Sequence, residues 1–299
     1  MIERNSDLVQ HRLMLHLAVV LFGFTAILGK LISVNAITLV FWRMVLALVL
    51  ILILQLGSGQ RFASLSKRDK YVFLTIGFLI GIHWFCFYAA VKMAHVSVAL
   101  ICMALTPMFT SLIEPLVERK TFERADLIFS LFMVPLIYFL IGGIIGFNMM
   151  GFIMGILAAF FAAFFSVMNK KMIKTTDNNT LMFYEFIGVL IISLITMLGM
   201  YQGGKINELL PSHSSDWMYL IILAWLCTNV AFKLTVVAMK KISVFETNLI
   251  IGLEPLYGIL LAVFIFKEYR FFTTQFYIAA ALIVALVFIY PLHKLKNHP

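Results

Sequence analysis

The chain has 299 residues, of which 63% are hydrophobic and only 12% are charged, and its formal net charge is +9. A soluble domain carries about 25% charged residues, whereas this chain repeats apolar runs of about 20 residues, the length that a helix needs to cross a bilayer. These values exclude a soluble globular domain and indicate an all-α polytopic membrane protein. Because the basic residues lie in short loops between apolar runs, we expect the lipid bilayer, and no nucleic acid, as a partner.

Ten transmembrane helices are predicted, and the connections between them are short. In chain order they cover 13–32, 37–56, 71–91, 96–116, 125–145, 150–169, 181–201, 217–238, 245–266 and 273–292. The longest connection, 202–216, is the one polar, turn-rich stretch and reads QGGKINELLPSHSSD. No soluble domain remains, so any function must lie among the helices or at their ends.

The distribution of lysine and arginine predicts the orientation in the membrane. With the N-terminus inside, 16 of the 23 basic residues fall on the inner side, and five fall on the outer side: Lys30, Lys92, Lys205, Lys267 and Arg270. Because cytoplasmic loops carry the excess of positive charge, both termini are predicted to face the cytoplasm of a cell inner (plasma) membrane. The first apolar run lacks a small-residue cleavage site, so we interpret it as a span and not as a signal peptide.

The chain contains an internal repeat. A shift of 148 residues aligns 90–107 (AVKMAHVSVALICMALTP) with 238–255 (AMKKISVFETNLIIGLEP), and the shared residues include Pro107 and Pro255. The same shift places the third and fourth spans over the eighth and ninth, so each half, 13–145 and 150–292, holds five spans. An odd number of spans forces the two copies to insert with opposite orientations, a plan that is common among secondary transporters.

Four stretches carry a resemblance to a known family: FGFTAILGKLISVNAITLVFWRMVLAL (22–48), ALTPMFTSLIEPL (104–116), GFIMGILAAFFAAFFSVMNKK (151–171) and LEPLYGILLAVFIFKEYRF (253–271). With its two-copy pattern, nearly the whole chain resembles the EamA family of the drug/metabolite transporter superfamily. The resemblance implies a ten-helix carrier with a central cavity that moves small metabolites, such as amino acids or nucleobases, most often outward. Members commonly carry a glutamate soon after the fourth span. The second half keeps one in KEY (267–269), but the first half reads ERK (118–120), so no role is transferred to Glu118.

Glu254 and Pro255 lie in the middle of the apolar ninth span. Glu254 is roughly 14 Å deep in a core about 30 Å thick. A carboxylate there costs about 3 kcal/mol to insert, so it should face the bundle interior or a wet cavity. Pro255 has no N–H to donate to the carbonyl of Ile251. We interpret Glu254 as a site for a substrate amine or a proton, with a glutamate that only packs as the alternative, and we add Tyr257 to the substrate-binding candidates.

Thr106 and Pro107 occupy the matching place in the fourth span. Thr106, Thr110 and Glu114 recur at every fourth position and therefore form one stripe on a helix face. Glu114 lies near the cytoplasmic end, where it is a gating candidate or pairs with a basic neighbour. Pro107 and Pro255 are predicted to kink the two spans in mirrored fashion, as paired hinges for alternating access.

The third span carries the aromatic stretch HWFCFY at 83–88. His83 lies near the middle of the membrane, and Trp84 and Tyr88 form a neighbouring line one turn apart. Trp84 is too deep for the aromatic belt that flanks a bilayer. We interpret these residues as a cavity wall that recognises flat or cationic ligands, with plain packing as the alternative.

Polar residues in three other spans complete the candidates. Trp225, Asn229 and Lys233 recur at every fourth position of the eighth span, which indicates either a cavity-lining stripe or a lysine that reaches the interface. Arg43 lies about 10 Å from the outer face and needs an internal partner. Its repeat counterpart Glu185 should lie at a different depth, so we expect no pairing between them and interpret Glu185 as mainly structural.

The leading interpretation is a secondary transporter, an exporter that works by alternating access around a central cavity. The substrate-binding candidates are Glu254, Thr106, His83, Trp84, Tyr88, Asn229 and Tyr257, and the coupling or gating candidates are Glu254, Pro107, Pro255, Arg43, Lys233 and Glu114. No G-x-x-x-x-G-K-[ST] loop is found, so ATP coupling within the chain is excluded. Energy would come from a proton or another ion, or transport would be facilitated and run downhill.

Two other classes of function remain open at this stage. An intramembrane enzyme would need a nucleophile with a base or a metal cluster such as H-E-x-x-H, and none is found. An ion channel would need charge rings or a filter loop. We expect no enzyme activity, no cofactor and no metal, and either a monomer or a homodimer.

Overall fold

The computed structural model describes residues 2–59, 61–122 and 124–297. Over these ranges the chain is helical, and extended backbone pairs within them at one isolated bridge, between Ile144 and Phe272. The first half holds α1 (Ile2–Leu31), α2 (Ala36–Gly57), α3 (Lys67–Met93), α4 (Val96–Met103), α5 (Thr106–Glu118) and α6 (Arg124–Ile141). The second half holds α7 (Met149–Met172), α8 (Asn178–Gln202), α9 (Ser214–Ala224), the π-helix η1 (Trp225–Val230), α10 (Ala231–Met239), α11 (Val244–Ile251), α12 (Glu254–Phe266), the 3₁₀ turn η2 (Glu268–Phe271) and α13 (Thr274–Asn297).

Polar residues in the connections fix where many helices begin. The side chains of Asn35, Ser66, Asn148, Asp177 and Ser243 accept hydrogen bonds from first-turn N–H groups of α2, α3, α7, α8 and α11. These N–H groups have no partner within their own helix, and a capping oxygen supplies one. Each apolar run therefore starts at a defined residue.

Eight segments of the described chain are long and apolar enough to cross a membrane. Three of them consist of consecutive helices: α4 with α5, α9 with η1 and α10, and α11 with α12. The predicted fifth and tenth spans correspond to α6 and α13, whose apolar stretches over the described residues are shorter, Leu131–Ile141 and Thr274–Leu286. The all-helical, multi-pass architecture is confirmed, and the count of ten spans stays a prediction.

The internal repeat is visible in the backbone. α4 and α11 have equal lengths, as do α5 and α12, and their bounds differ by the same 148 residues as the aligned sequences. Between the two halves of each broken helix lies a leucine with nearly the same dihedral angles, φ −80° and ψ −9° at Leu105 and φ −82° and ψ −9° at Leu253. Each second half ends at a left-handed residue, Arg119 or Lys267.

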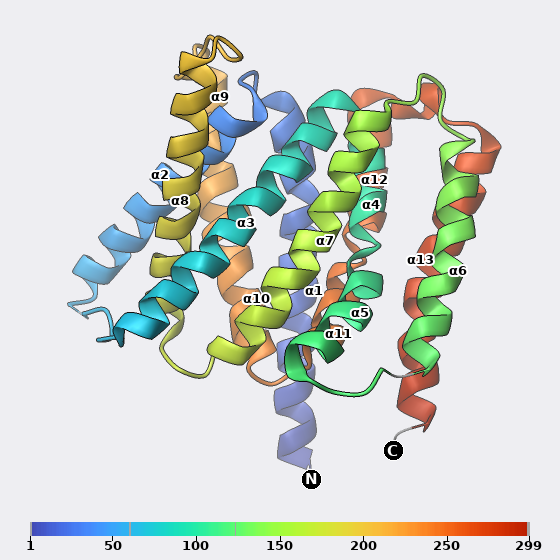
Figure 1. Ribbon diagram of the computed structural model, residues 1–299, viewed down its shortest axis with the longest axis horizontal. Coiled ribbons are helices and arrows are strands. Elements are labelled where there is room, and N and C mark those ends of the chain that lie inside the picture. Colours follow the sequence, from blue (N-terminus) through green and yellow to red (C-terminus); the bar gives the residue numbers. More distant parts are fainter. Residues whose placement is uncertain (1, 60, 123, 298–299) are drawn as a thin grey trace.

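The two broken helices lie side by side and run in opposite directions. α4 packs against α12, and α5 packs against α11. In Figure 1, α4 and α12 lie above α5 and α11, and both chain termini lie at the lower side. We call this lower side the terminal end of the bundle and the other side the opposite end. The antiparallel arrangement is the one that an inverted repeat produces.

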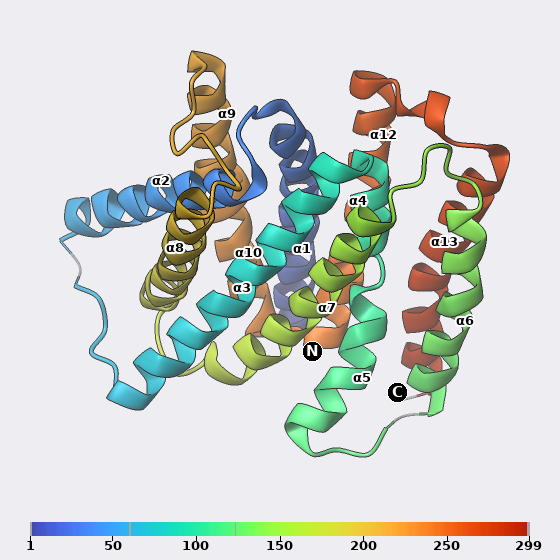
Figure 2. The ribbon, with the colours of Figure 1, turned by 45° about the horizontal axis from the view of Figure 1, so that its top comes forward.

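The remaining helices surround this central pair. α3 packs against α7 and α8, and α1 contacts α10, α11 and α12. α6 and α13 pair with each other at one side of the bundle, as both views show (Figures 1 and 2). Helices of both halves therefore meet along the middle of the molecule.

Candidate functional site

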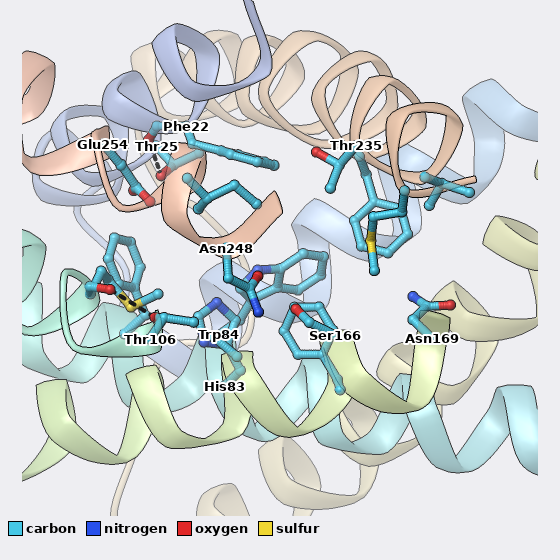
Figure 3. A pocket seen from close by; sticks show the side chains of 18 of the residues that line it. Phe22, Thr25, His83, Trp84, Thr106, Ser166, Asn169, Thr235, Asn248 and Glu254 are labelled. Carbon is cyan, nitrogen blue, oxygen red and sulfur yellow. Dashed lines mark hydrogen bonds between the residues drawn. The ribbon is translucent and has the colours of Figure 1, made fainter. Parts of the chain in front are cut away.

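A cavity lies between the two halves of the chain. Its wall takes side chains from α1, α2, α3, α4, α5, α7, α10, α11 and α12. Figure 3 shows Glu254 and Thr25 at one end of this cavity and Asn169 at the other. The lining residues are Phe22, Thr25, Arg43, His83, Trp84, Phe87, Met103, Thr106, Ala162, Phe165, Ser166, Asn169, Phe232, Thr235, Val236, Met239, Asn248, Ile251 and Glu254.

Arg43 of α2 is a buried cation in this wall, with 2% of its surface exposed. Its Nε donates to Thr228 Oγ1 at 2.6 Å, its Nη1 donates to Tyr88 Oη at 2.8 Å, and its Nη2 donates to the carbonyl of Cys227 at 3.4 Å. Its Cζ lies 3.9 Å from the centre of the Trp84 ring, where the cation meets the negative face of the indole. Neutral groups therefore hold the guanidinium in place.

Glu254 is the acidic residue of the cavity wall, and 5% of its surface is exposed. It is the first residue of α12, beside the break after α11. Its carboxylate and Arg43 act on each other electrostatically. No ion pair joins them in the described part of the chain, so the cavity wall holds a basic and an acidic side chain that do not contact each other directly.

Thr106 holds the same repeat position as Glu254, and its hydroxyl serves the backbone. Its Oγ1 donates to the carbonyl of Met103 at 2.7 Å. Pro107 has no N–H for that carbonyl, so the threonine replaces the missing donor. In the other half, Pro255 likewise has no N–H for the carbonyl of Ile251. Glu254, when ionised, has no proton to donate to that carbonyl. The two halves thus differ chemically at the break, where the cavity lies.

His83, Trp84 and Phe165 form the aromatic part of the wall. His83 Nδ1 lies 2.8 Å from the carbonyl of Ala158, so this nitrogen carries the proton that the bond requires. The His83 ring lies 5.5 Å from that of Phe165 and 6.2 Å from that of Phe87. The predicted aromatic wall of the third span thus lies on the cavity at His83 and Trp84.

The structure brings five candidate residues to the cavity: Arg43, His83, Trp84, Thr106 and Glu254. Tyr88 lies behind them, fully buried, and its hydroxyl accepts from Arg43. Pro107 and Pro255 lie at the first turns of α5 and α12, at the breaks.

The other four candidates lie outside the cavity lining. Tyr257 packs against Gly23 of α1, and Asn229 donates to the carbonyls of Ala47 and Ala224. Lys233 is exposed on α10, and Glu114 lies near enough to Lys170 to act on it electrostatically.

The π-helix η1 explains why the predicted stripe of the eighth span does not form. A π-helix bonds residue i to i+5 and so inserts an extra residue into the turn, which rotates everything that follows. Trp225 and Lys233 are exposed, whereas Asn229 between them is buried. The three residues therefore do not share one face.

Several polar lining residues were missed at the level of sequence: Thr25, Ser166, Asn169, Thr235 and Asn248. Each lies within an apolar span, where a polar side chain tends to face the bundle interior. Asn248 also links the halves, because its Nδ2 donates to Thr110 Oγ1 at 2.8 Å. That general signal was available in the sequence for all five residues.

Both halves of the chain match a known protein family. The family model described as "EamA-like transporter family" matches residues 12–142 and again residues 149–290. A search among curated proteins found no matching sequence. Among solved structures, one crystal structure of another protein aligns with a TM-score of 0.69 over 97% of this chain and 99% of that chain, at 17% identity. At this identity the likeness shows the fold alone.

Proposed function

Because the chain belongs to the EamA-like transporter family, we propose that it is a secondary transporter that moves a small organic metabolite across the cytoplasmic membrane by alternating access. The observation that carries this proposal is the cavity between the two halves, which holds Arg43 and Glu254 in its wall. A site at the interface of inverted repeats, beside discontinuous helices, is the common arrangement in carriers of this kind.

The charges of the cavity favour an amino acid over a nucleobase as the substrate. A guanidinium has five N–H groups, and three of those of Arg43 are engaged by Thr228, Tyr88 and Cys227. The two that remain suit a carboxylate, which arginine binds as a fork. Glu254 suits the ammonium group, and the rings of His83 and Trp84 suit an apolar side chain. A zwitterion therefore complements the cavity better than a neutral base.

The position of the cavity supports loading from the cytoplasm and hence export. From the break at Glu254 it extends toward Asn169 and Met239, near the terminal end, where Lys170 and Lys171 lie. This is the side that the distribution of basic residues predicts as cytoplasmic.

At the opposite end, contacts close the bundle. Ser33 donates through its N–H (2.9 Å) and its hydroxyl to the carboxylate of Asp216. Lys92 donates to the carbonyl of Ile32 at 2.8 Å. Alternating access would require these contacts to open while the terminal end closes.

Counterflow in proteoliposomes tests the proposal. Vesicles that contain the purified chain are loaded with unlabelled amino acids and diluted into the labelled ones, with nucleobases as a second set. We expect saturable uptake of amino acids that depends on the internal load. Ohmic conductance without counterflow would favour a channel instead, and formation of a new product without translocation would favour an enzyme.

A further inference from the structure

Glu185 is an acidic side chain with no exposed surface, and it lies outside the set of residues that line the cavity. It lies in α8, where the backbones of α3 and α8 touch: a Cβ atom added to Gly77 would collide with the carbonyl of Glu185, and one added to Gly188 would collide with the carbonyl of Leu74. The two helices therefore contact each other through their backbones at Glu185.

Asn169 is the hydrogen-bonding partner of Glu185, and the match between them is incomplete. Asn169 Nδ2 lies 3.4 Å from Glu185 Oε2, which is a long bond. Glu185 Oε1 and Asn169 Oδ1 are both buried and have no partner in the described part of the chain. Two acceptors thus lack a donor at the same place, and exchanging the N and O of the amide would not remove the deficit.

Among the described residues, no basic side chain forms an ion pair with Glu185. Lys170 of α7 donates to the carbonyls of Met239 and Ile242, and Lys70 of α3 lies over the ring of Tyr184. Arg43 of α2 is held by its own partners, and Lys233 of α10 is exposed. The charged and titratable groups of the helices around Glu185 are Arg43 of α2, Lys67, Arg68, Asp69, Lys70, Tyr71, His83, Cys86, Tyr88 and Lys92 of α3, Lys170 and Lys171 of α7, Tyr184 and Tyr201 of α8, and Lys233 of α10. An ionised carboxylate without a counter-charge costs several kcal/mol in such a place.

A proton fits this site better than a metal ion. A bound Ca²⁺ or Mg²⁺ needs at least six oxygen ligands, and the described residues contain no group of three His, Cys, Asp or Glu side chains that could hold a metal. A single proton on Glu185 removes the charge and supplies the missing donor to Asn169. In this step a water-borne proton adds to the carboxylate and gives the neutral acid, and no other bond changes.

The cavity reaches this site through Asn169. Asn169 lies in the cavity wall one turn after Ser166, whereas Glu185 lies behind it. Figure 3 shows Asn169 at the end of the cavity away from Glu254. Glu185, which bonds to Asn169, and Glu254 therefore lie toward different ends of the cavity.

We propose that Glu185 and Asn169 form a proton-binding site that is distinct from the substrate site at Glu254 and that couples proton movement to transport. The coupling role rests on the proposed function as a carrier, whereas the binding of a proton does not. When the cavity is open at the terminal end, the site exchanges protons with that side. Conversion to the other conformation carries the neutral acid with it.

Infrared difference spectroscopy of the purified protein in liposomes tests proton binding without any substrate. The wild type is compared with Glu185→Gln, with Asn169→Ala and with Glu254→Gln as the matched control. At neutral pH we expect a band from the protonated carboxyl group of Glu185. This band should be absent in Glu185→Gln, shifted in Asn169→Ala and still present in Glu254→Gln. A carboxyl band that is the same in Glu185→Gln and the wild type would overturn the proposal.

A second measurement tests the coupling. Proteoliposomes with a pH gradient are given a mixture of labelled proteinogenic amino acids, and uptake against a concentration gradient is measured. We expect Glu185→Gln to abolish accumulation driven by the pH gradient while it keeps exchange at equal pH. Retained accumulation would refute the coupling role. A protonated Glu185 in a chain that transports nothing would instead overturn the carrier function and leave the proton site standing.

Discussion

At the scale of single residues, the cavity wall holds a buried cation that forms no ion pair with any carboxylate in the described ranges. Arg43 is stabilised by hydrogen bonds to Thr228 and Tyr88 and by the face of Trp84. Hydrogen bonds from a planar fork and stacking on a ring are properties of arginine that lysine lacks. The positive charge of Arg43 is thus held by neutral groups, which leaves it able to bind the carboxylate of the proposed substrate.

The substitution Arg43→Lys tests this positioning. The charge remains, but the bonds to Thr228 and Tyr88 and the stacking on Trp84 are lost. We expect the half-saturating substrate concentration in counterflow to rise by about tenfold, which corresponds to about 1.4 kcal/mol. Lys233→Arg, on the exposed face of α10, serves as the control and should leave it unchanged. Equal values for Arg43→Lys and the wild type would contradict the role of Arg43 in binding.

The sequence predicted several wall residues for a simple reason. Polar and ionisable residues deep in apolar spans must turn inward, and this rule places Arg43, His83 and Glu254 on the cavity. The rule gives the direction of a side chain and not its neighbours. It therefore could not show that Asn169 and Glu185 meet across α7 and α8 with an unsatisfied pair of acceptors.

At the scale of the helices, the two breaks are built alike but completed differently. In both, a proline at the start of the second helix leaves a carbonyl of the first helix without its N–H donor. Thr106 supplies a hydroxyl to this carbonyl in the first half. Glu254 stands in that place in the second half and leaves a carboxylate in the cavity wall.

Replacement of Thr106 by valine should show what its hydroxyl contributes. In Thr106→Val the carbonyl of Met103 loses the donor that replaces the N–H of Pro107. We expect the free energy of unfolding in detergent to fall by about 1 kcal/mol. In Thr196→Val, the lost hydroxyl contacts Ile192, whose carbonyl lies inside an intact helix and keeps its backbone donor. This control should be nearly neutral, and equal losses in both variants would contradict the explanation.

Glu268 of the KEY stretch caps the N-terminus of α4. Its carboxylate accepts from the N–H groups of Val96 (2.7 Å) and Ser97 (2.9 Å) and from Ser97 Oγ (2.6 Å). An anion at a helix N-terminus is favoured by the exposed N–H groups and the dipole. The corresponding repeat position is Lys120, which cannot accept a hydrogen bond. The repeat position of Glu268 therefore cannot give α11 the carboxylate cap that Glu268 gives α4.

The substitution Glu268→Gln places an amide among three donors. We expect a loss of about 2 kcal/mol in the free energy of unfolding, because bonds to a charged acceptor are replaced by a mismatch. Thermal unfolding in detergent measures the loss. Glu208→Gln, at an exposed residue, is the control. A Glu268→Gln protein as stable as the control would show that this cap does not stabilise the closed end.

The helical elements were largely predictable, and the irregular ones were not. Apolar runs of about 20 residues located the spans. The π-helix η1 changes which face of the eighth span the following residues lie on. The periodicity of the sequence does not predict this change. For this reason the stripe expected from Trp225 to Lys233 does not form, although the repeat of α4–α5 in α11–α12 was predicted from the residues themselves.

At the scale of the whole molecule, two antiparallel halves enclose one cavity that lies toward the terminal end. The family match over both halves agrees with this plan. The basic residues lie mainly in connections at the terminal end, and from this bias we predict that this end faces the cytoplasm.

Labelling of single cysteines tests this orientation. Cys86, Cys102 and Cys227 are buried, and a variant without them provides the background. With a membrane-impermeant maleimide on intact cells, Ser212→Cys in the longest connection should be labelled directly. Thr175→Cys, between α7 and α8, should be labelled only after the membrane is opened. The reverse pattern would place the termini outside and contradict both the orientation and the direction of export.

We propose that the substrate binds in the cavity at Glu254, and counterflow by the variant Glu254→Gln tests this binding. Glu118→Gln, a substitution of the same kind at a residue paired with Lys120 outside the cavity, is assayed beside it. We expect Glu254→Gln to reduce the rate of amino-acid counterflow by at least about tenfold, while Glu118→Gln transports like the wild type. Equal rates for the wild type and Glu254→Gln would contradict the account.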